Sequence, residues 1–152
     1  METLFATAHV VAAVFVIGPM AILPMTAMRA MRAGQGAQVA VLARSTFVFS
    51  MLSLLVVVFG FGILPFSNYG TTVSTPWVLA SLILYVIALG LSLFGVVPAL
   101  RAAAEQLTGA PNAGSAGSAG SVGAARTRVA MLSGITSLLL VVIVVLMTWK
   151  PG

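Results

Sequence analysis

The sequence predicts an all-α integral membrane bundle of four transmembrane helices. Of its 152 residues, 61% are apolar and only 6% are charged, whereas about a quarter of the residues in soluble domains carry a charge. Four apolar runs are each close to or above the ~20 residues that a helix needs to cross a bilayer. The chain is too short to hold a folded soluble domain beside such a bundle. We therefore expect a single four-helix transmembrane domain over residues 1–152.

The first span is expected over residues 3–28. Arg29 and Arg32 follow this apolar run, and no basic segment precedes it, which is the reverse of a cleavable signal peptide. The run should therefore stay in the membrane as an anchor. Pro19 and Pro24 lie inside it, and because each proline removes a backbone donor and clashes one turn back, we expect a bend in its second half.

The other three spans are expected over residues 46–66, 76–100 and 129–149. Between the third and fourth spans lies a segment in which glycine, serine and alanine recur, Gly114–Gly123. It has no large apolar side chain to pack, so the composition predicts a flexible Gly/Ser/Ala cytoplasmic linker over residues 108–125. Before this linker, Arg101–Leu107 is expected to continue the third helix beyond the membrane.

The basic residues predict the orientation of the bundle. Six of the seven lie in the first and third connections, whereas the second connection, Ser67–Thr75, has no charge. Because cytoplasmic loops are enriched in Lys and Arg, both termini should lie outside a bacterial inner membrane that the chain crosses several times. The net charge of +5 then reflects topology and contacts with lipid headgroups, and predicts no nucleic-acid partner. The topology determinants are Arg29, Arg32, Arg44, Arg101, Arg126 and Arg128.

His9 is the one side chain in the apolar runs that titrates near neutral pH. Counted along ideal helices, Ser81 and Tyr85 of the third span lie at a comparable depth. A neutral imidazole that is hydrogen-bonded to a hydroxyl of a neighbouring helix would satisfy both groups. We therefore expect a structural polar contact between helices among His9, Ser81 and Tyr85, with no catalytic, cofactor or metal residue assigned.

The alternative is that His9 binds haem or copper, because an ionisable group inside a membrane is a functional hypothesis by default. A haem usually takes a second axial ligand, and the chain has no second histidine. Methionine could serve either metal, but only Met1 and Met147 are expected at the depth of His9. The other six methionines are expected in the opposite half: Met20, Met25, Met28, Met31, Met51 and Met131.

Several absences narrow the function. The chain has no cysteine, so thiol redox chemistry and thiolate metal sites are excluded. Its two acidic residues, Glu2 and Glu105, lie outside the expected spans, which disfavours a transporter driven by an intramembrane carboxylate. No catalytic dyad or phosphate loop can be assembled from the remaining residues. We therefore expect no enzyme activity and no resident cofactor.

Four features carry a resemblance to a known family: His9 early in the first span, Gly18-Pro19 in its middle, arginines just after it, and the ending Met147–Gly152. The chain resembles an uncharacterised family of small bacterial integral membrane proteins with four spans. That family shares a pattern with copper-resistance D-type proteins, which have further histidines that this chain lacks.

Size and layout are also similar to those of the small four-span factor associated with bacterial respiratory supercomplexes. The likeness implies a non-catalytic accessory subunit whose partners are other integral membrane subunits, a respiratory oxidase complex among them, and lipids. A small haem- or copper-binding protein that uses His9 is the alternative.

Overall fold

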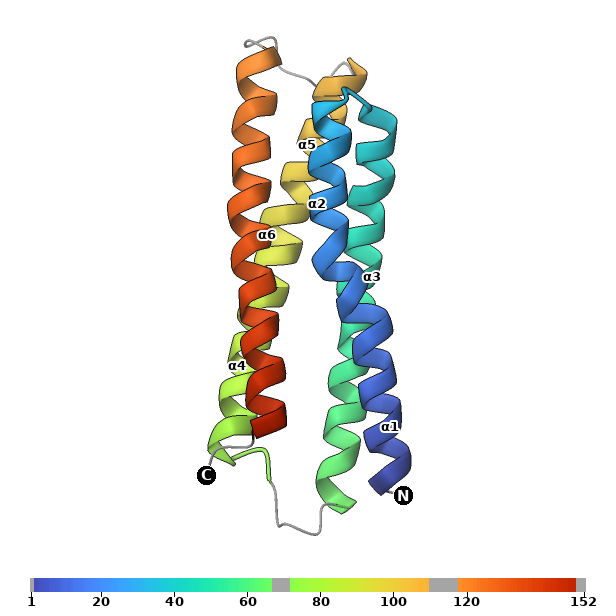
Figure 1. Cartoon of the computed structure of the whole chain (residues 1–152), viewed down its shortest axis with the longest axis vertical. Helices are drawn as coiled ribbons and strands as arrows, with labels where there is room; N and C mark the ends of the chain where they lie inside the picture. Colours follow the sequence, from blue (N-terminus) through green and yellow to red (C-terminus); the bar gives the residue numbers. More distant parts are fainter. Residues whose placement is uncertain (1, 67–71, 110–117, 150–152) are drawn as a thin grey trace.

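The computed structural model describes residues 2–66, 72–109 and 118–149, and these form long helices packed side by side (Figure 1). The chain order is α1 (Glu2–Ala12), η1 (Ala13–Ile17), α2 (Gly18–Arg32), α3 (Gly36–Ile63), η2 (Leu64–Phe66), α4 (Pro76–Gly90), η3 (Leu91–Val96), α5 (Val97–Thr108) and α6 (Ser118–Trp149). Consecutive helices join into four spans that are long and apolar enough to cross a membrane: Thr3–Arg32, Gly36–Phe66, Pro76–Thr108 and Val122–Trp149. The predicted all-α four-span bundle is thus confirmed.

α1 begins and α6 ends at one end of the bundle, and α2 and α5 end and α3 and α6 begin at the other (Figure 1). We call these the termini end and the arginine end. The second name follows from six exposed arginines in the parts of the four spans nearest to that end: Arg29, Arg32, Arg44, Arg101, Arg126 and Arg128. The predicted segregation of basic residues to one end is therefore present in the fold.

The first and third spans are each interrupted by a π-helical segment, η1 and η3. Gly18-Pro19 directly follows η1, and Pro98 follows η3 at the start of α5. A proline lacks the N–H that would bond to the carbonyl four residues earlier, and wider π turns are one way in which a helix accommodates such a break. A bend was expected in the second half of the first span; the structure has a π segment in the middle of that run, Ala13–Ile17, and Pro24 is buried inside α2, which is an uninterrupted α-helix.

The helices extend beyond the apolar runs at the arginine end. As expected, α5 continues to Thr108, where Gly109 ends it with a φ of 66°. The start of α6 differs from the expectation, because it begins at Ser118 and so makes residues 118–125 of the predicted linker helical. Alanine favours a helix, and adding residues to an existing helix is cheap. Residues 110–117 of that linker lie outside the described residues.

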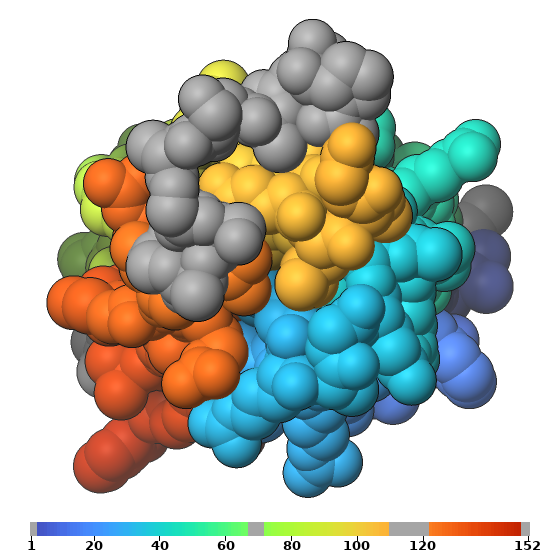
Figure 2. Space-filling model, turned by 90° about the horizontal axis from the view of Figure 1, so that it is seen from above, coloured from blue at the N-terminus to red at the C-terminus, as the bar shows by residue number. Residues whose placement is uncertain are grey.

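The hydrophobic core lies towards the arginine end. Here α2, α3, α5 and α6 form a closed ring in which each helix packs against two neighbours, and Figure 2 shows this end from above. Towards the termini end, α1 packs on α3 and α4 packs on α6 (Figure 1). One cluster of buried residues makes up this core: Ala27, Ala30, Met31, Val39, Ala43, Val96, Leu100, Ala103, Ala104 and Val129.

Candidate functional site

A seam of buried hydroxyl side chains, from serine, threonine and one tyrosine, runs through the bundle. The seam residues lie three, four or seven positions apart, which are one or two helical turns, so each helix presents them on one face. All are buried, and they lie on three of the four spans: Thr46, Ser50 and Ser53 on α3, Ser81, Tyr85 and Ser92 on α4 and η3, and Ser133 and Thr136 on α6. Small and polar residues at such positions allow helices to approach closely and to hydrogen-bond across the interface.

Two hydrogen bonds of the seam join α3 to the third span, whereas Thr46, Ser133 and Thr136 bond to the backbone of their own helices. The Ser53 hydroxyl donates to the carbonyl of Ser50 at 2.6 Å, so the 2.7 Å contact between Ser53 and Tyr85 has the Tyr85 hydroxyl as donor. One turn closer to the arginine end along α3, the Ser50 and Ser92 hydroxyls are 2.8 Å apart. Because Ser53 donates to a backbone carbonyl, which cannot pass a proton onward, this arrangement is a clamp between helices rather than a proton relay.

His9 joins α1 to α3 through the backbone. Its Nδ1 lies 2.7 Å from the carbonyl oxygen of Val56, and because a carbonyl only accepts, Nδ1 carries the proton. Gly60 lies beside the ring, and a Cβ atom added there would be 3.1 Å from Cε1 and 3.2 Å from Nδ1 of His9. The glycine therefore provides the space that allows the imidazole to reach the carbonyl.

Phe5 repeats this arrangement one turn closer to the termini end. A Cβ atom added at Gly62 would be 2.6 Å from the Phe5 ring, so Phe5 fills the space above that glycine. The Phe5 ring also stacks on Phe66, with ring centroids 5.7 Å apart. α1 thus packs on α3 through two aromatic rings seated on two glycines, and the hydrogen bond of His9 fixes the register of the pair.

The three residues expected to form one polar contact are distributed differently. His9 bonds to Val56, Tyr85 bonds to Ser53, and the buried hydroxyl of Ser81 has no hydrogen-bond partner among the described residues. The prediction grouped these side chains because they lie at a similar depth. Their hydrogen bonds depend instead on which helices are neighbours, and α1 packs on α3. Val56 and Gly60 were missed, since a backbone acceptor has no side-chain pattern. The spacing Gly60-Phe61-Gly62 in an otherwise bulky span was the available indication of close packing.

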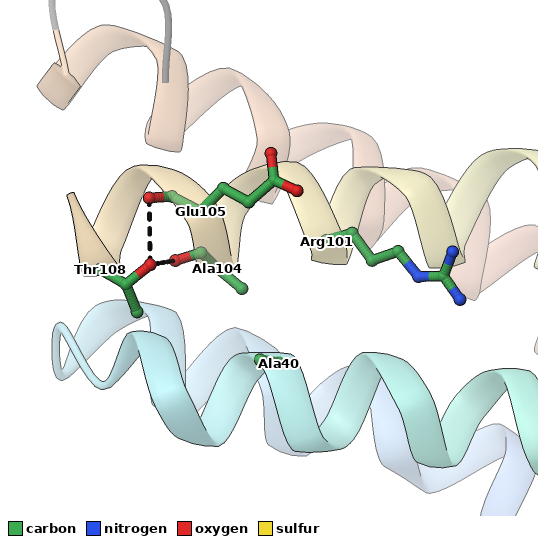
Figure 3. A pocket seen from close by; sticks show the side chains of 5 residues that line it. All are labelled: Ala40, Arg101, Ala104, Glu105 and Thr108. Atoms are coloured by element: carbon green, nitrogen blue, oxygen red, sulfur yellow. Dashed lines mark hydrogen bonds between the residues drawn. The ribbon is translucent and has the colours of Figure 1, made fainter. Parts of the chain in front are cut away.

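A small cleft opens at the arginine end between α3 and α5 (Figure 3), with a volume of about 170 Å³. Arg101 and Glu105 lie on its rim, but their side chains point in different directions (Figure 3). The Arg101 guanidinium lies over the ring of Phe47, 5.6 Å from its centroid, and Thr108 bonds to the backbone of its own helix. The charged groups therefore do not converge on a point where a ligand could be held.

The described residues contain no group of three or more His, Cys, Asp or Glu side chains that could hold a metal ion. The described residues provide hydrogen bonds between helices in the interior, the imidazole of His9 near the termini end, and exposed apolar helix faces. A family described as predicted integral membrane protein (DUF2269) matches residues 3–151. No curated protein and no solved structure matches the chain.

Proposed function

Because the chain belongs to the predicted integral membrane protein (DUF2269) family, whose members lie in lipid, we propose that it is a non-catalytic accessory subunit of a larger membrane complex. On this proposal, the protein acts by docking other membrane subunits on its outward helix faces. The single observation that carries this proposal is the difference between two groups of glycines in the spans.

Four glycines are contact points inside the bundle. At each, an added Cβ atom would meet a residue of a neighbouring helix at 2.6–3.1 Å: Gly36, Gly60, Gly62 and Gly95. In a membrane, where lipid is as apolar as leucine, helices associate through such close fits rather than through hydrophobic burial. Glycine therefore marks the places where this chain brings two helices together.

Three other glycines in the membrane have open space in front of them, with no atom within 4 Å of an added Cβ: Gly18, Gly90 and Gly134. Each is flanked, one turn away along its helix, by large exposed apolar side chains: Val14, Phe15 and Ile22, then Val86, Ile87 and Phe94, then Met131 and Leu138. Phe94, four residues from Gly90, is 84% exposed. These outward faces repeat the ridges and hollows by which the bundle packs internally, and they support docking of further helices.

The proposed partner is an oxidase-containing respiratory complex in a bacterial inner membrane, with the arginine end in the cytoplasm. The support for this choice is the likeness in size and span layout to the four-span factor of respiratory supercomplexes. The orientation is supported by the arginines gathered at one end of the fold, because positive charge is retained on the cytoplasmic side.

The test is native gel electrophoresis of membranes solubilised in mild detergent. The chain should co-migrate with the oxidase complex, and its deletion should loosen that assembly without abolishing electron transfer. In the deletion strain, Gly134→Leu should restore the assembly less well than the wild-type chain, because a leucine fills the hollow. Val141→Leu is the matched control, since residue 141 of the same helix is already large and exposed.

Two results together would contradict the proposal. The first is migration of the chain as an isolated small species in mild detergent. The second is a set of respiratory assemblies that is unchanged in the deletion strain. Purified Gly134→Leu protein should keep the helical content and thermal stability of the wild type, which separates a docking defect from a folding defect.

A further inference from the structure

His9 presents a ring nitrogen that is available as a ligand. Because Nδ1 donates its proton to Val56, the Nε2 of the neutral ring keeps an unshared electron pair. Nε2 has no hydrogen-bond partner among the described residues, and it is not an enclosed atom like the oxygen of Ser81. The half-exposed His9 side chain therefore offers a base to the apolar surroundings of the bundle, where lipid has no donor for it.

The surroundings hold this ring in one orientation. Proteins commonly orient a metal-binding imidazole by a hydrogen bond from its other nitrogen to a backbone carbonyl or a carboxylate, and the carbonyl of Val56 fills that place at 2.7 Å. Gly60 leaves just enough room for the ring, since its added Cβ would be 3.1 Å from Cε1. The structural anchoring of α1 on α3 and the presentation of Nε2 are therefore compatible.

The number of protein ligands available at His9 indicates which kind of metal group it could bind. A bare metal ion needs several protein ligands, and the described residues contain no suitable cluster of His, Cys, Asp or Glu. An iron porphyrin brings four nitrogens of its own, so that one protein imidazole suffices to hold the iron axially. Its macrocycle is apolar and suits the membrane. We propose that Nε2 of His9 is an axial ligand of an iron porphyrin at the termini end of the bundle.

The test is a titration of the purified full chain in detergent with haemin. One haemin should bind per chain, with a shift of its main absorption band from that of free haemin in the same detergent. His9→Gln, which keeps a polar side chain but removes the imidazole, should abolish the shift. His9→Met should bind haemin with a differently placed band, because a thioether is also an axial ligand.

A second pair of variants leaves His9 in place. Gly60→Ala should weaken haemin binding about 10-fold to 100-fold, the usual cost of disturbing the groups that orient a metal-binding histidine. Gly90→Ala is the matched control and should leave the affinity unchanged, since its added Cβ meets nothing within 4 Å. Circular dichroism and gel filtration establish that each variant is folded.

Two outcomes would overturn the proposal: no stoichiometric binding by the wild type, or equal binding by the wild type and His9→Gln, which means that haemin only partitions into the detergent and the protein surface. If His9→Gln does not fold, the comparison of Gly60→Ala with Gly90→Ala decides, and equal affinities of these two would overturn it. The titration uses the isolated chain, so its result is independent of the docking function.

Discussion

At the scale of single residues, the hydrogen bond between Tyr85 and Ser53 has a defined donor, the Tyr85 hydroxyl, so removing the donor and removing the acceptor should have different costs. Ser53→Ala would leave the buried Tyr85 hydroxyl without its acceptor, which should cost about 1–3 kcal/mol of unfolding free energy. Tyr85→Phe leaves the bond from Ser53 to the Ser50 carbonyl in place and should cost only about 0.6 kcal/mol. Unfolding of the purified variants in mixed detergent micelles measures both. A larger loss for Tyr85→Phe would mean that the donor and acceptor are reversed.

Ser81 gives the opposite expectation, because its buried hydroxyl has no partner among the described residues. Removing an unsatisfied buried polar group removes its desolvation penalty. Ser81→Ala should therefore raise the unfolding free energy by about 1 kcal/mol, with Ser92→Ala as the contrasting variant that loses a bond to Ser50. A marked loss of stability in Ser81→Ala would instead reveal a partner for this oxygen.

The residues of the candidate site were only partly predictable. His9 was identified because an imidazole in an apolar run is chemically conspicuous, and its attachment to another helix was expected. Its acceptor is the Val56 carbonyl, and every residue has such a carbonyl, so no side-chain pattern could select it. The role of Gly60 also depends on which helix lies opposite, which is a tertiary property.

At the scale of helices, the sequence predicted four apolar spans, but it did not predict how far α3 and α6 extend beyond them at the arginine end. Hydropathy marks where a helix is in contact with lipid, and it carries no information on how far the helix continues into water. α3 begins at Gly36, where it packs on the end of α5 at Leu107 and Thr108, whereas the continuation of the third helix past residue 100 was expected. Residues 118–125 were predicted to be a linker because they are rich in glycine and serine. They are helical because adding residues to an existing helix is cheap.

The contact between α3 and α5 at Gly36 gives a prediction at this scale. An added Cβ would lie 2.8 Å from Cβ of Leu107 and 3.0 Å from its backbone carbon, atoms that cannot move without shifting α5. Gly36→Ala should therefore destabilise the protein by about 1–3 kcal/mol, the usual cost of overpacking. Thermal unfolding in detergent measures the loss, and Gly90→Ala, with open space around it, should show little change.

At the scale of the whole molecule, the gathering of arginines at one end predicts its orientation. The chain has no cysteine, so a single cysteine can be placed without background. Thr72→Cys, in the exposed segment before α4, should react in intact cells with a thiol reagent that cannot cross membranes. Gln38→Cys, exposed at the arginine end, should react only after the cells are opened. The reverse labelling would place the termini in the cytoplasm.

The uneven distribution of the core has a consequence for motion. Proteins open locally where few buried contacts must be broken, and amide hydrogen exchange reports the free energy of each opening. The closed ring of α2, α3, α5 and α6 should therefore exchange slowly, whereas α1 and α4, held mainly by one neighbour each, should exchange faster. The half of the bundle that carries His9 is thus the half that can part and reclose while the other half stays folded.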